Sequence, residues 1–441
     1  MTRNELSRIM ICDNLDVSAD GRLLFGGRDT VSLAEKYGTP LFLMDEERLR
    51  HNCRLYVNAV NRHFGEGAKV LYASKASSFK RIYEIINEEG MGCDVVSSGE
   101  IYTASLAGFP LENAYFHSNN KTDADIEYAI ASGIGYFVVD NEEELFAIDR
   151  IAGEKGKVQN ILFRLTPGID PHTYAAVATG KVDSKFGSAI ETGQAEEITR
   201  LALSLKNVHL CGFHCHVGSQ VFDSDVYLRA SEIMLGFIAD MQKKLGLKTE
   251  ILDLGGGYGV RYTEDDPTIN IEKNIGQVAK HIKSCVKKLG IDMPSIRFEP
   301  GRSIVADTTL TLYTVGTVKR IPGYKNYVSV DGGMTDNPRF ALYGSKYTVA
   351  SAGKLNEPPA LSCSVVGRCC ESGDIIAEGV RLPESTKRGD IIAVLTTGAY
   401  NYSMSSNYNR VARLPIIMVR GDEDYVAVRR ESLEDIARND M

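Results

Sequence analysis

The chain has 441 residues, of which 43% are apolar and 24% are charged, as in a globular protein too long for a single hydrophobic core. Its formal net charge of −8 argues against nucleic-acid binding as the main role. No apolar stretch approaches the roughly 18–20 residues that cross a membrane, and the N-terminal segment lacks the apolar core of a signal peptide. We therefore expect a cytoplasmic protein with no membrane partner.

Eight short apolar runs are predicted strands, and amphipathic helical stretches such as residues 79–90 separate them. Strands that alternate with helices pair in parallel through right-handed crossovers. Eight such units in about 230 residues match a (β/α)8 TIM barrel, whereas a doubly wound sheet would not readily give eight consecutive units. The predicted strands cover residues 70–76, 92–97, 114–119, 136–140, 160–167, 209–218, 251–257 and 295–301.

The first four predicted strands begin 22 residues apart, a spacing that also raises a leucine-rich repeat. The L-x-x-L-x-L signature is missing, however, which disfavours that fold. From residue 309 onward the pattern becomes β-rich with little helical periodicity, which predicts an all-β sandwich or barrel-like domain. Short β-like pieces in residues 1–35 are expected to join it. We thus expect a barrel over 36–308 and a β domain over 1–35 and 309–441.

Polar side chains gather where the predicted strands end, which in a TIM barrel is the face that carries the active site. A lysine beside an apolar strand can have a lowered pKa and attack an aldehyde. Three glycines after a strand let backbone N–H groups approach a phosphate, and a buried carboxylate can keep a pyridine nitrogen protonated. Together these features predict pyridoxal 5′-phosphate. The residues are Lys75, Asp94, His117, Asn119, His214, His216, Gly255, Gly256, Gly257, Glu299 and Arg302.

Each feature also has a simpler interpretation. Lys75 alone could extend its ammonium into solvent, and three glycines alone could form a tight turn. His214 and His216 could form a metal pair, but no further ligand set with convincing spacing is present, so we expect no metal. The nine cysteines lack paired C-x-x-C spacing, which favours free thiols.

The sequence resembles the fold-type III pyridoxal-phosphate decarboxylases, which have an alanine-racemase-like barrel, and within them the diaminopimelate decarboxylases. The resemblance covers about residues 35–415. Nine blocks occur in the family's order: YASKA, CDVVSSGE, HSNNKT, FHCHVGSQ, LDLGGGYG, EPGR, DGGMTDNPRFALYG, CCESGD and GAYNYSMSSNYN.

The resemblance implies a role for each matched residue. Lys75 would form the Schiff base with the cofactor, and Glu299 would bind the pyridine nitrogen. Cys370 would be the proton donor, whereas Cys369 should point the other way along an extended strand. The remaining cofactor contacts would be Asp94, His216, Ser219, Gly257, Gly301, Arg302 and Tyr400. The substrate contacts would be Arg302, Arg339, Tyr343, Glu371 and Tyr400.

The resemblance further implies a homodimer with shared active sites, to which the partner subunit contributes the CES segment. The expected reaction is the decarboxylation of meso-2,6-diaminopimelate to L-lysine and CO2, the last step of bacterial lysine biosynthesis. A decarboxylase of ornithine, arginine or D-lysine is the alternative on the same fold, but such substrates give no reason for Arg302, Arg339 and Tyr343 to converge. A racemase is disfavoured by the glutamate at the pyridine nitrogen. A non-catalytic homologue would be expected to lack Lys75 or the Cys370-Glu371 pair.

Overall fold

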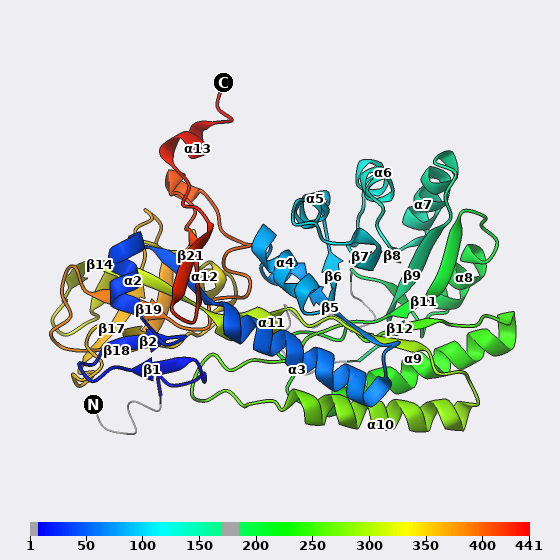
Figure 1. Cartoon of the computed structure of the whole chain (residues 1–441), viewed down its shortest axis with the longest axis horizontal. Coiled ribbons are helices and arrows are strands. Elements are labelled where there is room, and N and C mark those ends of the chain that lie inside the picture. Colours follow the sequence, from blue (N-terminus) through cyan, green and yellow to red (C-terminus); the bar gives the residue numbers. More distant parts are fainter. Residues whose placement is uncertain (1–7, 170–184) are drawn as a thin grey trace. The chain divides into compact units, whose positions relative to one another are not determined.

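The structure, a computed structural model, describes residues 8–169 and 185–441 (Figure 1). The chain divides into two compact units. The barrel unit comprises Asn52–Gly259 and Thr268–Ser303, and the β unit comprises Met1–His51, Val260–Pro267 and Ile304–Met441. No helix within the described ranges combines the length and apolar character of a membrane span.

Eight parallel strands close into a ring in the barrel unit, which confirms the predicted (β/α)8 architecture. The pairing of β8 with β9 closes the ring, and the short β10 (Ser188–Ala189) pairs with the C-terminal end of β9. In ring order the strands are β5 (Lys69–Ala73), β6 (Gly92–Val95), β7 (Ala114–Phe116), β8 (Tyr136–Val139), β9 (Gln159–Thr166), β11 (Val208–His214), β12 (Ile251–Asp253) and β13 (Ser295–Phe298).

Amphipathic helices follow the strands and lie outside the ring (Figure 1). α4 buries the isoleucines and the tyrosine that its sequence repeats at helical spacing. α6 begins with a reciprocal capping box between Thr122 and Asp125, which satisfies two N–H groups of its first turn. The helices are α4 (Lys80–Glu88), α5 (Ser98–Leu106), α6 (Asp123–Ser132), α7 (Glu142–Glu154), α8 (Gln194–Ala202), α9 (Ser224–Leu245) and α10 (Ile271–Leu289), and α3 (Glu46–Phe64) precedes them.

The β unit is built on a mixed sheet with the order β18-β17-β15-β14-β4-β20-β21. A small sheet of β1 (Leu15–Val17), β2 (Leu23–Phe25) and β3 (Arg28–Asp29) and helix α2 (Thr30–Tyr37) complete the N-terminal part. The strands of the main sheet are β4 (Leu41–Asp45), β14 (Thr309–Lys319), β15 (Tyr327–Val330), β17 (Leu361–Val366), β18 (Ile375–Leu382), β20 (Ile416–Arg420) and β21 (Glu423–Val428), and β19 (Ile391–Val394) pairs with β14 and β16 (Val349–Ser351).

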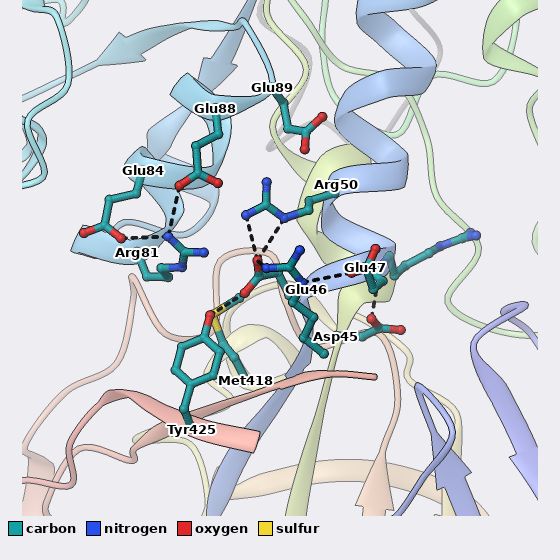
Figure 2. Close-up of polar contacts among 12 residues, drawn as sticks. Asp45, Glu46, Glu47, Arg50, Arg81, Glu84, Glu88, Glu89, Met418 and Tyr425 are labelled. Carbon is teal, nitrogen blue, oxygen red and sulfur yellow. Dashed lines mark hydrogen bonds and ion pairs between the residues drawn. The ribbon is translucent and has the colours of Figure 1, made fainter. Parts of the chain in front are cut away.

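Residues 36–51 lie in the β unit, although the sequence grouped them with the barrel. The reason is that β4 pairs with both β14 and β20. The turn from β4 into α3 is fixed by Glu46, whose side chain is buried (Figure 2). Its Oε1 accepts hydrogen bonds from Arg50 Nε and Nη2 at 2.9 and 2.7 Å, and its Oε2 accepts one from the Tyr425 hydroxyl on β21.

Candidate active site

Lys75 lies at the mouth of the barrel and not within its apolar strand. Residues 70–73 of β5 are buried, and Lys75 follows them in a single 3-10 turn, Ser74–Ala76. Its side chain is 43% exposed, and its Nζ lies 3.8 Å from Oδ2 of the buried Asp94 at the end of β6. The hydroxyl of Ser74 lies 2.7 Å from the Asp94 carbonyl oxygen and 2.9 Å from Glu100 Oε2, which anchors the turn. The ammonium is thus accessible beside a carboxylate.

Glu299 is the centre of a buried charged cluster. Its Oε1 lies 2.7 Å from His117 Nε2 and its Oε2 lies 3.1 Å from His214 Nε2. The two imidazole rings meet edge to face with centroids 4.9 Å apart. Burial raises the pKa of Glu299, but the two histidines outweigh burial and hold that pKa well below its usual value. Glu299 is therefore an anion in the floor of the site.

The pKa of Asp94 is shifted in the opposite direction to that of Glu299. Burial raises its pKa, although the charges of His117 and Lys75 act against that rise. Neither carboxylate oxygen of Asp94 has a hydrogen-bonding partner in the described residues, and the same holds for His214 Nδ1. Buried polar atoms are normally satisfied in native proteins. These atoms therefore indicate that a polar group belongs in the site.

A β-bulge brings His214 of β11 into the barrel. The register against β9 shifts between Leu210 and Gly212, so the extra residue reverses the inside–outside alternation. His214 consequently faces Glu299. Two residues on, His216 Nδ1 accepts a hydrogen bond of 3.4 Å from the Gly256 N–H. Burial, together with the charge of Lys75, holds the pKa of His216 well below its usual value, so this imidazole is neutral.

Gly256 and Gly257, which follow β12, lie so close to neighbouring backbone segments that no larger residue fits. A Cβ on Gly256 would lie 2.0 Å from the Glu299 carbonyl oxygen, and one on Gly257 would lie 2.1 Å from that of Gly218. Gly257 also has φ +105°, which favours glycine. The ends of three neighbouring strands thus converge here at backbone distance. Only glycine permits this packing.

The wall after β13 is equally tight. A Cβ on Gly301 would lie 2.8 Å from the Cβ of Ala73, so the chain passes directly beside the end of β5. Arg302 is buried, and its Nη2 and Nε lie 2.9 and 3.3 Å from Ser219 Oγ. The structure therefore brings Ser219 and Arg302 together at the same end of the barrel as Lys75.

Arg339, Tyr343 and Tyr400 form a second cluster, within the β unit. The Arg339 guanidinium lies 5.4 Å from the centroid of each tyrosine ring, within the range of a cation–π contact. Its Nη2 lies 3.4 Å from Ser345 Oγ, but its buried Nε has no hydrogen-bonding partner in the described residues. Tyr400 has φ +63°, a strained value for a non-glycine residue. A planar cation with a free N–H suits a carboxylate.

Cys370 and Glu371 are both exposed in the loop between β17 and β18. The expectation of an extended strand here is wrong, because residues 367–374 form bends and a turn. Asp374 organises the loop: its Oδ2 accepts a hydrogen bond of 2.7 Å from the Cys369 N–H and its Oδ1 one of 2.6 Å from the Met334 N–H. Cys369 is partly buried, and burial raises the pKa of its thiol to about 11.

Two ionisable residues of the barrel mouth escaped the sequence analysis. Asp253 ends β12, is fully buried and accepts a hydrogen bond of 2.8 Å from the Gly255 N–H. Burial and the charge of Glu299 raise its pKa well above the usual value, so Asp253 is protonated beside that anion. Arg164 on β9 stacks 4.3 Å from the Phe186 ring centroid. Both follow the strand-end pattern, which could have identified them.

The site fits pyridoxal phosphate better than a metal ion. It offers an accessible lysine for an aldehyde, a buried anion for a pyridine nitrogen, and several unsatisfied polar atoms. The ligand atoms of His117, His214 and Glu299 lie within 4.8 Å of one another, which a metal could also use. Direct contacts of 2.7 and 3.1 Å between the two imidazoles and the carboxylate account for that arrangement without an ion.

Comparison with known proteins gives one consistent family. The model of "Pyridoxal-dependent decarboxylase, pyridoxal binding domain" matches residues 47–306. The diaminopimelate decarboxylase of Bacillus subtilis is 42% identical, over 96% of this chain and 95% of that protein, and the one of Halalkalibacterium halodurans is 43% identical, over 96% of each. The crystal structure of diaminopimelate decarboxylase from M. jannaschii with L-lysine has a TM-score of 0.89 at 32% identity, covering 97% of this chain and 98% of that one. The chain therefore belongs to the pyridoxal-dependent decarboxylases, and among them to the diaminopimelate decarboxylases.

Proposed function

We propose that this protein decarboxylates meso-2,6-diaminopimelate to L-lysine and CO2 with pyridoxal 5′-phosphate as cofactor. The observation that carries the proposal is the arrangement of Lys75, Asp94 and Glu299 in one barrel mouth, with an accessible ammonium above a buried carboxylate. The same activity is named for relatives at 42–43% identity over nearly the whole chain. A biosynthetic carboxy-lyase is the function that these features support, and we propose that it acts in the cytoplasm.

Named residues would hold the cofactor. The Lys75 amine would bond its aldehyde carbon, and the neutral imidazole of His216 would stack on the ring. Glu299 would hold a proton on the pyridine nitrogen, because an anion with a depressed pKa favours a protonated partner. The phosphate would lie at Ser219, the Gly255–Gly257 turn and Tyr400, with Gly301 and Arg302 completing the wall.

The bound cofactor supplies a protonated pyridine ring that accepts the electron pair released when CO2 leaves. The protein residues orient the substrate and move protons around that event. Asp94, with its raised pKa, orders the Lys75 amine at the reacting carbon. The thiol of Cys370 would then donate a proton to the carbon that lost its carboxylate.

Substrate selection would depend on the distal carboxylate. The guanidinium of Arg339, which contacts two tyrosine rings and has its Nε free, would bind that carboxylate through two parallel hydrogen bonds. Arg302 and Tyr343 would support it, and Glu371 would bind the distal amine. A relative of known structure holds L-lysine, which keeps the same distal carboxylate.

We further propose a homodimer in which the partner subunit completes each active site with its CES segment. Cys370 and Glu371 are exposed in the single chain, as residues that serve a partner's site would be. Mixing inactive Lys75→Ala and Cys370→Ala proteins tests this. Random reassortment of two-fold dimers should restore about a quarter of the wild-type activity. Recovery of no activity after verified subunit exchange would contradict shared sites.

The substrate is tested by supplying the purified protein and cofactor with meso-diaminopimelate, L-ornithine, L-arginine, D-lysine or L-lysine in separate reactions. CO2 release from meso-diaminopimelate alone is the expected result. Release from ornithine, arginine or D-lysine but not from meso-diaminopimelate would make the chain a decarboxylase of another diamino acid.

A further inference from the structure

A buried lysine lies next to the loop that follows β7, and the proposed chemistry does not use it. The Lys121 side chain is 0% exposed, and its Nζ lies 2.7 Å from Oε1 of the equally buried Glu144 on α7. The ammonium also donates to the carbonyl oxygens of Ser118 at 3.0 Å and Val138 at 2.9 Å. Each of its three N–H groups therefore has an acceptor.

The surroundings of this ammonium fix its position. The Phe116 ring of β7 lies 5.5 Å from Nζ. Burial lowers the pKa of Lys121, whereas the facing carboxylates of Glu144 and Asp140 act against that fall and Arg164 adds to it. A buried ion pair seldom stabilises a fold more than apolar residues of the same size would. The buried pair of Lys121 and Glu144 therefore points to a role in positioning the backbone that Lys121 contacts.

Lys121 binds a strained part of the loop. Ser118 has φ +131°, in the region that favours glycine. Its hydroxyl accepts a hydrogen bond of 3.2 Å from the Asn120 N–H, which tightens the turn. The bond from Lys121 to the Ser118 carbonyl oxygen fixes the direction of this strained peptide.

Ser118, the strained residue, directly follows His117, and the His117 side chain contacts Glu299. The His117 N–H donates to the Val95 carbonyl oxygen at 2.8 Å, so the backbone is fixed before the imidazole as well as after it. The imidazole Nε2 lies 2.7 Å from Glu299 Oε1. A rotation of the peptide at Ser118 would therefore move the imidazole that keeps Glu299 ionised.

We propose that Lys121 is a positioning residue: with Glu144 as its counter-charge, it holds the Ser118 carbonyl and thereby keeps the His117 imidazole against Glu299. The proposal rests on the proposed function, in which Glu299 binds the pyridine nitrogen. The contact between His117 and Glu299 can nevertheless be measured without substrate.

Three variants separate positioning from simple stability. Lys121→Met removes the charge and keeps the length of the side chain, but it leaves Glu144 buried without its partner. The double variant Lys121→Met/Glu144→Met also removes that unpaired carboxylate, so it keeps the test valid if the single variant fails to fold. Lys155→Met is the matched control, because Lys155 forms an exposed 3.0 Å ion pair with Glu127 of α6.

The measurements are made on the holoenzyme. Nitrogen-15 spectra of the histidine rings follow His117 among the eight histidines, and absorbance titration gives the affinity for pyridoxal phosphate. Both Lys121 variants should shift the His117 signal and weaken cofactor binding about tenfold. They should lower kcat about ten- to a hundredfold with little change in KM, the loss that a displacement of about 1 Å causes. The Lys155→Met protein should match the wild type.

Two outcomes would overturn the proposal. The first is an unchanged His117 signal and an unchanged cofactor affinity in a folded Lys121 variant. The second is a wild-type His117 signal and cofactor affinity in the double variant, which would show that the pair acts only through stability. A wild-type protein that releases no CO2 from any diamino acid would instead refute the proposed function. The histidine spectra would still decide the role of Lys121.

Discussion

Replacing Arg339 with methionine should remove the grip on the distal carboxylate while leaving the fold intact. The Arg339 guanidinium is buried, lies 5.4 Å from the Tyr343 and Tyr400 ring centroids, and has no partner for its Nε in the described residues. Methionine fills a similar volume beside the two rings and makes favourable contacts with aromatic faces. The substitution leaves no buried charge without its counter-ion.

The magnitude follows from the bonds lost. Two unit charges about 4 Å apart attract by about 4 kcal/mol near a protein surface, which is an upper bound. A hydrogen bond to a charged group contributes about 1.5–3 kcal/mol after desolvation is counted. Two such bonds contribute about 3–6 kcal/mol, which the upper bound limits to about 3–4 kcal/mol. At about 1.4 kcal/mol for each factor of ten, kcat/KM for meso-diaminopimelate should fall roughly 100- to 1,000-fold. Most of the loss should be in KM, since the carboxylate is bound before and during the reaction.

Two inhibitors provide the assay. L-lysine keeps the distal carboxylate of the substrate and cadaverine lacks it, so the Arg339→Met protein should bind L-lysine more weakly by a similar factor and cadaverine within about twofold. Arg320→Met serves as the control, because Arg320 forms an exposed ion pair with Glu384 in the same unit. Equal weakening for L-lysine and cadaverine, or a loss in kcat/KM of less than about threefold, would refute the assignment of Arg339 to the carboxylate.

Three further predictions concern single residues. The Lys75→Ala protein should lack the yellow absorbance band that borohydride abolishes in the wild type, and a persisting band would place the cofactor on another side chain. Because the pKa of His216 is lowered in the folded state, its contribution to stability should be complete above about pH 6.5 and decline as the pH falls toward that lowered pKa. His216→Phe should therefore make the decrease of Tm between about pH 6.5 and 5 shallower, and an unchanged slope would contradict this. Tyr425→Phe removes a donor to the buried Glu46 carboxylate (Figure 2), a bond of about 1.5–3 kcal/mol. In a unit of this size each kcal/mol lowers Tm by about 2–4 °C, so Tm should fall by about 3–12 °C; a shift below about 1 °C would show that solvent replaces the hydroxyl.

The order of strands and helices in the barrel could be predicted because the sequence patterns that indicate them are local. Each strand is a short apolar run, each run is followed by an amphipathic helix, and parallel pairing with right-handed crossovers then permits few topologies. The polar residues at the strand ends, Lys75, Asp94, His214 and Glu299 among them, could be assigned to one face for the same reason. The nine sequence blocks then specified the chemistry, and the family comparisons confirm it.

The partners of each polar residue could not be predicted, because they depend on contacts between distant segments. The contact of His214 with Glu299 requires the bulge between Leu210 and Gly212, which period-two alternation does not reveal. The CCES segment was expected to be extended, whereas hydrogen bonds to Asp374 fold it into a bend.

The sequence by itself thus determined the fold class, the reactive face and the cofactor, since strand periodicity and residue chemistry are properties of short segments. Tertiary structure alone decided which charges are paired, as with Lys121 and Glu144, 23 positions apart in the chain. The physical reason is that burial makes the state of an ionisable group depend on the few atoms that surround it, and only the folded chain brings those atoms together.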